Sequence, residues 1–331
     1  MLETSAKLKE ILLNTNKELR TKYSIDDNLD KIELRDKIED EVGELVDLNK
    51  MTNNDLQHWL GKESIVGVDG SVNKIGSNYP HYLFLLQALA KSTEKKDIIE
   101  AELFCPLTSI SKEEIIDFID KQEEKGKRLS KQDAANKIRI SKLAELELEV
   151  ALQSIKNWDP KLIMLDGSLI RYRIEDEDKW KELKELAIKE NVLLVGIIEE
   201  IGTREIGKRL SGDLRGNDFY DREILFGLLE KGEMLSLEFK IGFKTAFMRT
   251  SRDPQVIGID ILDEQQNDLQ KIADLVYTLT PEDGRGVPVW LDIVDNEVRI
   301  SDQMIKNLVE TYLDSDLQRR LFYSKRDERV Y

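Results

Sequence analysis

The sequence is poor in cysteine, histidine and proline. Its 331 residues include one cysteine, two histidines and six prolines. Because Cys105 is the only cysteine, no disulfide can form within the chain, and the composition suits a reducing compartment such as the cytoplasm. The lack of cysteine and histidine clusters also argues against a zinc site.

Long apolar runs and an excess of positive charge are missing as well. No run is long enough to span a bilayer, and residues 1–20 lack the apolar core of a signal peptide, so we expect no membrane partner. The net charge is −16. This argues against a general nucleic-acid binder, which is usually basic, but it is compatible with an enzyme that combines an acidic metal site with a local basic groove.

Two short apolar runs end on the same tripeptide. Residues 65–68 and 162–165 are each followed by Asp-Gly-Ser, beginning at Asp69 and at Asp166. Each run predicts a buried strand with a turn at its end, so each strand carries an aspartate to its carboxyl end. Two such strands side by side would place both carboxylates within reach of one divalent cation.

A third acidic residue is predicted to point inwards from a helix. The helix is expected at 130–158, with Ser130 as its N-cap. The neighbours of Glu147 at helical spacing are all apolar, so its side chain should face the core. A buried glutamate is costly unless it binds a metal ion or pairs with Lys or Arg. We favour the metal because Asp166 follows shortly after.

The order of predicted elements indicates an α/β fold with a mixed sheet flanked by helices, as in ribonuclease H-like nucleases. An antiparallel meander is expected first, then two helices, then a parallel pair of strands around a helix. The expected strands are 65–69, 82–90, 98–104, 162–166, 192–198, 234–239, 244–249 and 256–262. The expected helices are 111–124, 130–158, 175–189, 265–279 and 302–317. A further apolar run, 289–294, leads to Asp295.

Three parts of the chain follow from this pattern. Residues 1–62 are expected to form an N-terminal helical arm, a lid or a dimer arm, because apolar residues recur there at helical spacing. Residues 63–318 would form the ribonuclease H-like domain, which includes a helical segment at 111–158. Residues 319–331 are expected to be a C-terminal tail.

Several of these segments together resemble the NurA nuclease family. They are Val68-Asp69-Gly70-Ser71, the inward Glu147, Leu165-Asp166-Gly167-Ser168-Leu169, the 194–197 strand and the Pro288 to Asp295 segment. The resemblance runs from about residue 65 to residue 313. It implies a ribonuclease H-like core, a homodimer and a Mn²⁺-dependent nuclease that acts on single-stranded DNA and 5′ ends. It also implies a hexameric HerA-type translocase ATPase as partner, in DNA end resection, repair or defence.

Carried over by position, the catalytic metal ligands would be Asp69, Glu147, Asp166 and Asp295. Their oxygens suit Mn²⁺ or Mg²⁺, and phosphodiester hydrolysis is well served by two such ions. Many family members have a lysine where this chain has Glu199 and Glu200, so we consider Arg204 as its substitute.

Candidate substrate-binding residues lie around these positions. A basic cluster after a strand end, together with one more arginine, would follow the DNA strand: Arg204, Lys208, Arg209 and Arg249. Tyr79 and His81 could stack on bases, and Ser71 could hydrogen-bond a phosphate or its own turn. Each of these basic residues could equally be an ordinary surface charge.

Two other functions remain open from the sequence. The chain could be a catalytically weak or silent nuclease-like subunit that serves as a binding module of a translocase complex. It could also hydrolyse RNA or another phosphoester with the same acidic residues.

Overall fold

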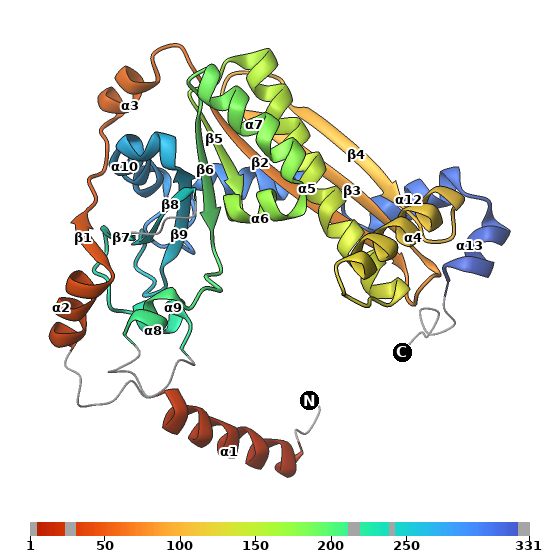
Figure 1. Ribbon diagram of the computed structural model, residues 1–331, viewed down its shortest axis with the longest axis horizontal. Coiled ribbons are helices and arrows are strands. Elements are labelled where there is room, and N and C mark those ends of the chain that lie inside the picture. Colours follow the sequence, from red (N-terminus) through yellow and green to blue (C-terminus); the bar gives the residue numbers. More distant parts are fainter. Residues whose placement is uncertain (1–4, 24–30, 211–218, 238–241, 324–331) are drawn as a thin grey trace.

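The computed structural model describes residues 5–23, 31–210, 219–237 and 242–323. These residues form a nine-stranded mixed sheet in the order β1-β7-β8-β9-β6-β5-β2-β3-β4, with helices on both faces (Figure 1). The strands are β1 Gly43–Asp47, β2 Ile65–Gly76, β3 Tyr82–Ser92, β4 Ile98–Phe104, β5 Leu162–Asp166, β6 Leu193–Ile198, β7 Glu233–Leu237, β8 Phe243–Arg249 and β9 Ile257–Leu262. The predicted mixed sheet flanked by helices is confirmed.

Helices make up most of the remaining regular structure of the described residues. They are α1 Ala6–Tyr23, α2 Lys31–Glu41, α3 Asn53–Leu60, α4 Ser109–Glu124, α5 Lys131–Trp158, α6 Leu169–Glu175, α7 Glu177–Lys189, α8 Glu205–Arg209, α9 Asp221–Leu225, the 3₁₀ helix η1 Asp263–Asp268, α10 Leu269–Leu279, α11 Val289–Val298, α12 Asp302–Tyr312 and α13 Ser315–Leu321. Among the described helices, none is long and apolar enough to cross a bilayer.

The centre of the sheet is parallel and its flanks are antiparallel. Strand β5 pairs in parallel with both β2 and β6, and β2, β3 and β4 form the predicted antiparallel meander. Side chains alternate between the two faces of a strand. Ile163 and Leu165 therefore pack with α5, α6 and α7, whereas Leu162 and Met164 pack with α10 and α11. Because β5 and β6 pair in parallel, their carboxyl ends lie next to each other, in the sheet between these two cores.

The N-terminal 62 residues are not purely helical, contrary to our prediction. Gly43–Asp47 is a strand that pairs with β7 at the edge of the sheet. The approach is so close that a Cβ added to Gly43 would lie 2.0 Å from the carbonyl oxygen of Ser236. Helical spacing of apolar residues could not reveal this strand, because its partner lies about 190 residues away in the chain.

Three other boundaries also differ from the sequence-based expectations. Residues 289–298, of which we assigned 289–294 only as an apolar run, form the helix α11. The expected helix at 302–317 is two helices, because Asp314 caps a new one by accepting hydrogen bonds from the backbone N–H groups of Asp316 and Leu317. The predicted tail at 319–331 begins inside α13, and its residues 324–331 lie outside the described part of the chain.

Candidate functional site

Asp69 and Asp166 lie side by side on adjacent parallel strands. Val68 of β2 pairs with Leu165 of β5, and each aspartate follows directly. Neighbouring strands are separated by about 4.8 Å, and both side chains alternate onto the face covered by α11. The site is therefore built on the two central strands of the sheet.

The first Asp-Gly-Ser is not the turn that we expected. Strand β2 continues through it to Gly76, because Asp69 pairs with Leu89 of the antiparallel neighbour β3 and the pairing extends to Gly76 and Tyr82. The second tripeptide does end its strand. Gly167 has a φ of +118°, which glycine adopts readily, and Ser168 caps α6.

Glu147 reaches the aspartates from the opposite face of the sheet. It lies on α5 with 1% of its surface exposed, as the sequence predicted. Its carboxylate fills the space where Gly70 lacks a side chain, since a Cβ added there would lie 2.4 Å from the Oε1 of Glu147. Glycine at position 70 is therefore needed for Glu147 to lie beside Asp69.

Asp295 reaches the same site from α11. This helix packs tightly on β2, with Val294 Cγ2 only 2.7 Å from an ideal Cβ at Gly67. The charge of Asp295 raises the pKa of both Asp69 and Asp166, and its carboxylate pairs with Arg299 at 2.7 Å. The structure thus places Glu147, Asp166 and Asp295 within electrostatic range of Asp69.

These carboxylates disfavour one another's charge. Burial raises the pKa of Asp69 to about 7, and the charges of Asp166 and Glu147 add to the effect. Burial also raises the pKa of Glu147 to about 7, against the opposing effects of Arg171 and Tyr172. The pKa of Asp166 rises through burial and through the charge of Glu199. A cluster of this kind is stabilised by added positive charge at neutral pH.

Arg171 supplies one such charge, and sequence reasoning missed it. It lies on α6, five residues after Asp166, and forms an ion pair with the Oε2 of Glu147. Burial alone would lower the pKa of Arg171, but Tyr172 and the nearby carboxylates, Glu147 above all, raise it overall. The alternative that we had ranked second for Glu147, a salt bridge, is therefore present in the structure beside the acidic cluster.

The carboxylates of the cluster are donors of the kind that a hard divalent cation prefers, but they are not grouped as a metal site. Asp69, Glu147 and Asp166 offer the carboxylate oxygens that Mg²⁺ and Mn²⁺ prefer. Within the described ranges, however, no three His, Cys, Asp or Glu side chains are grouped so that they could hold a metal ion as they stand. Glu147 is instead held in an ion pair by Arg171.

Asp260 holds the second turn in place, and this role was also missed. It is almost fully buried on β9, accepts a hydrogen bond from Ser168 Oγ at 2.5 Å and accepts another from Thr245 Oγ1 at 2.7 Å. Its pKa is raised by burial, and these hydrogen bonds oppose the rise. A lone aspartate within the apolar strand Ile257–Leu262 was the available signal, because a buried carboxylate needs partners.

Glu199 adds a fifth acidic group at the end of β6. It pairs with Arg285 at 2.7 Å, and both residues act on Asp166, Glu199 raising its pKa and Arg285 lowering it. Glu199 also lines a cavity of about 530 Å³ together with Phe226 and Arg222. The carboxyl ends of strands are where open α/β sheets usually bind ligands.

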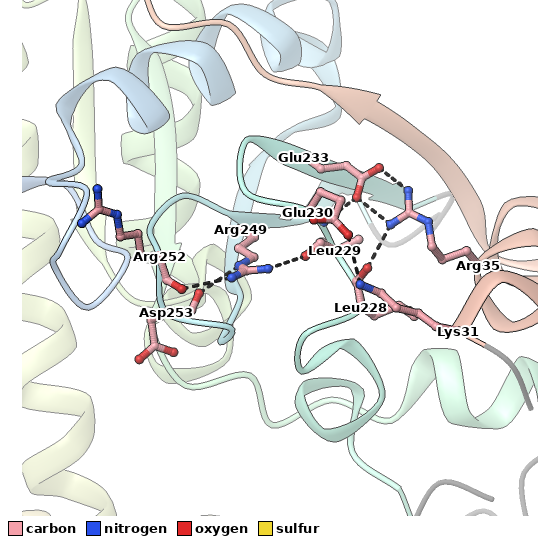
Figure 2. Close-up of polar contacts among 9 residues, drawn as sticks. All are labelled: Lys31, Arg35, Leu228, Leu229, Glu230, Glu233, Arg249, Arg252 and Asp253. Atoms are coloured by element: carbon pink, nitrogen blue, oxygen red, sulfur yellow. Dashed lines mark hydrogen bonds and ion pairs between the residues drawn. The ribbon is translucent and has the colours of Figure 1, made fainter. Parts of the chain in front are cut away.

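Most of the predicted DNA-contacting cations have structural partners. Figure 2 shows that Arg249 donates hydrogen bonds to the carbonyl oxygens of Leu229, Arg252 and Asp253, each at 3.0 Å. Arg209 donates to the carbonyl oxygen of Val42 at 3.1 Å and thereby ties α8 to the end of α2. Arg249 therefore stabilises backbone in the structure and does not extend along an open path.

The other two cations of the cluster contact side chains and not backbone carbonyl groups. Lys208 is exposed and pairs with Glu205. Arg204 precedes α8, and its guanidinium lies 4.1 Å from the ring centroid of Tyr220. Such a stacked guanidinium keeps its charge available to a phosphate.

The remaining candidates lie along the β2–β3 hairpin. Ser71 donates a hydrogen bond to the carbonyl oxygen of Val298 at 2.7 Å, so it joins β2 to the end of α11. Tyr79 and His81 lie in and next to the connection that follows Gly76. Gly76 is itself seven residues beyond Asp69 along β2, and seven residues of extended strand span about 23 Å. The structure does not bring these two rings to the acidic cluster.

The chain is similar to known proteins over most of its length. The model of the NurA domain matches residues 63–300. The chain belongs to the NurA family.

Solved structures resemble this NurA-family chain at low sequence identity. The NurA nuclease from Sulfolobus solfataricus is 17% identical, with a TM-score of 0.56 over 97% of this chain and 100% of that protein. The catalytic domain of human endonuclease V is 11% identical, with a TM-score of 0.38 over 93% of this chain and 98% of that protein. No curated protein sequence matches the chain.

Proposed function

We propose that this chain is a divalent-metal-dependent DNA nuclease. The observation that carries the proposal is the convergence of Asp69, Glu147 and Asp166, from β2, α5 and β5, at one edge of the sheet in a NurA-family chain. Buried carboxylates that raise one another's pKa are typical of sites that bind cations or transfer protons. The Sulfolobus relative is described as a nuclease, which supports the same activity here.

The residues divide the work of phosphodiester hydrolysis. Asp69, Glu147 and Asp166 would hold Mn²⁺ or Mg²⁺, with Asp295 as a further ligand towards a second ion. Two such ions, when bound, polarise the phosphoryl oxygen and generate a nucleophilic water. Asp260 keeps the turn after Asp166 in position through Ser168, and Arg204 offers a cation to the DNA backbone.

We further propose that the substrates are single-stranded DNA and 5′ ends, and that a hexameric HerA-type translocase delivers them. A net charge of −16 opposes free DNA binding, so delivery by a partner would compensate. Action as a homodimer in the cytoplasm, in end resection, repair or defence, belongs to the same proposal and follows the family.

Digestion of end-labelled DNA tests the activity. The wild-type protein, with Mn²⁺ and with or without the translocase, should degrade labelled single strands, and EDTA should stop the reaction. Asp69→Asn should abolish degradation, whereas Asp178→Asn, which removes an equal charge from the exposed start of α7, should not. Cleavage by Asp69→Asn at the wild-type rate would refute the proposed role of the cluster.

One observation favours the second candidate function, a silent subunit that binds the translocase. Glu147 is already paired with Arg171, and the described residues hold no ready group of three metal ligands. If wild-type protein binds the translocase tightly but cuts no DNA with any divalent cation, alone or in the complex, this second function replaces the first.

A further inference from the structure

We infer that Arg171 is a built-in counter-ion for Glu147 that competes with the divalent cation, and that it thereby sets how tightly the site binds metal. This inference rests on the proposed metal-dependent function. It concerns a positioning residue, because Arg171 would act through Glu147.

The position of Glu147 makes competition for its carboxylate unavoidable. One oxygen, Oε1, lies in the space above Gly70, beside Asp69, and the other, Oε2, pairs with Arg171. With 1% of its surface exposed, the carboxylate has no access to bulk water that could replace a partner. Glu147 therefore keeps its negative charge only beside a partner such as the guanidinium or a metal ion, because a buried charge without a partner is strongly unfavourable and the carboxylate would otherwise take up a proton.

The guanidinium itself lies within the acidic cluster. An ideal Cβ at Gly167, next to Asp166, would be 3.5 Å from Nη1 of Arg171. The charges of Glu147, Asp166 and Asp69 all raise the pKa of Arg171. Its Nε is buried and has no hydrogen-bond partner among the described residues. Arg171 is thus held by its ion pair with Glu147 and by the Tyr172 ring, 4.5 Å from its guanidinium, with incomplete hydrogen bonding, so that it can be displaced by a cation of higher charge.

An arginine cannot give way by losing its proton, because its pKa is too high. A divalent ion that is shared by Asp69 and Asp166 would repel a guanidinium held among the same carboxylates. Glu147 therefore exchanges its partner as the ion binds, and Arg171 turns towards solvent, where its side chain is already 37% exposed. Its new position near the cluster would suit a substrate phosphate.

Direct Mn²⁺ titration tests this competition without measuring nuclease activity. Free Mn²⁺ is followed by its electron paramagnetic resonance signal with wild type, Arg171→Gln and Arg173→Gln. Arg173 is the matched control, because it lies on the same helix and stacks on Phe243 with its guanidinium 4.9 Å from the ring centroid. We expect Arg171→Gln to bind Mn²⁺ about tenfold more tightly than Arg173→Gln, equivalent to about 1.4 kcal/mol.

Two further variants keep the test decisive. Arg171→Lys retains the charge with fewer donors and should fall between wild type and Arg171→Gln, which covers the case in which Arg171→Gln does not fold. When Glu147→Gln is also present, proteins with arginine or glutamine at position 171 should bind Mn²⁺ with equal affinity. In the metal-free state Arg171→Gln should unfold at a lower temperature than wild type, and Mn²⁺ should restore more of its stability.

The outcomes separate this inference from the proposed function. Equal Mn²⁺ affinity in Arg171→Gln and Arg173→Gln would overturn the competition, and weaker binding in Arg171→Gln would mean that Arg171 orients Glu147 for the ion. Failure of both wild type and Arg171→Gln to bind Mn²⁺ at millimolar concentration would instead overturn the proposed function. Binding by Arg171→Gln alone would support the inference in its strongest form.

Discussion

The two Asp-Gly-Ser segments have the same sequence but different local structures. The segment at Asp69 lies inside a continuous strand that pairs with β3, whereas the segment at Asp166 ends its strand and begins a helix. The first glycine makes room for Glu147, and the second adopts a φ of +118°. A tripeptide therefore determines which side chain reaches the site, but the neighbouring strand determines whether the backbone turns.

The largest expected effect, on the rate of DNA cleavage, comes from replacing the aspartate that begins each segment. Asp69→Asn and Asp166→Asn should each lower the rate of metal-dependent DNA cleavage by on the order of 10³-fold, because both carboxylates act on the same reacting group. The double variant should be scarcely slower than either single one. Rates from end-labelled single-stranded DNA check this, and additive losses would mean that the two aspartates act in separate sites.

Replacement of the two glycines should affect stability and Mn²⁺ affinity differently. Gly70→Ala places a Cβ against Glu147 Oε1 and should lower both stability, by about 2 kcal/mol, and Mn²⁺ affinity. Gly167→Ala strains only the backbone, at a cost of about 1–2 kcal/mol, since its Cβ would meet Arg171 Nη1 at an ordinary 3.5 Å. Urea unfolding and Mn²⁺ titration measure the two effects. Equal loss of Mn²⁺ affinity in both variants would contradict the comparison.

The stability of the folded protein should depend on pH, and Asp69 should contribute more to this dependence than Asp166. In EDTA, the pKa values of Asp69 and Glu147 are raised to about 7 in the folded state, above about 4 in the unfolded chain. The folded state thus binds protons more tightly, so stability should fall as pH rises from about 4 to 7.

Asp69→Asn should flatten this fall by more than Asp166→Asn does, because only Asp69 of the two has its pKa raised as far as about 7. Thermal unfolding between pH 5 and pH 8 provides the measurement. Stability that rises over this range in the wild type would contradict the expected sign.

The smallest expected difference is between the stability losses caused by replacing the two serines. Ser168→Ala removes the cap of α6 and leaves the buried Asp260 without one of its donors, which should cost about 1–2 kcal/mol. Ser71→Ala removes one hydrogen bond to the carbonyl oxygen of Val298, at a cost of about 1 kcal/mol. Chemical unfolding of both variants decides the order, and a larger loss in Ser71→Ala would reverse our view of the two segments.

Much of the fold could be predicted because its signals are local. The apolar strands β5 and β6 and the long helix α5, with Ser130 as its cap, follow from periodicity over a few residues. The inward direction of Glu147 follows from the same periodicity. Strand β1 and helix α11 were missed because their short sequences are compatible with more than one structure, and only packing on the sheet decides between them.

The surroundings of the site were harder to predict. Arg249 looked like a DNA contact because its charge is visible in the sequence, whereas the carbonyl oxygens that it binds lie on the surrounding loops. Arg171 and Asp260 were overlooked because their importance comes from partners 24 and 92 residues away in the chain. Charge and burial in a site depend on which distant residues share it.

The sequence by itself determined that two aspartates follow buried apolar runs and that one glutamate faces the core, since side-chain direction repeats with the backbone of each element. Tertiary structure alone decided that β2 continues past Asp69, that Arg171 pairs with Glu147, and that Asp295 reaches the site from a helix. The reason is that strand pairing and ion pairing join residues far apart in the chain, and their energies exist only after the elements have packed together.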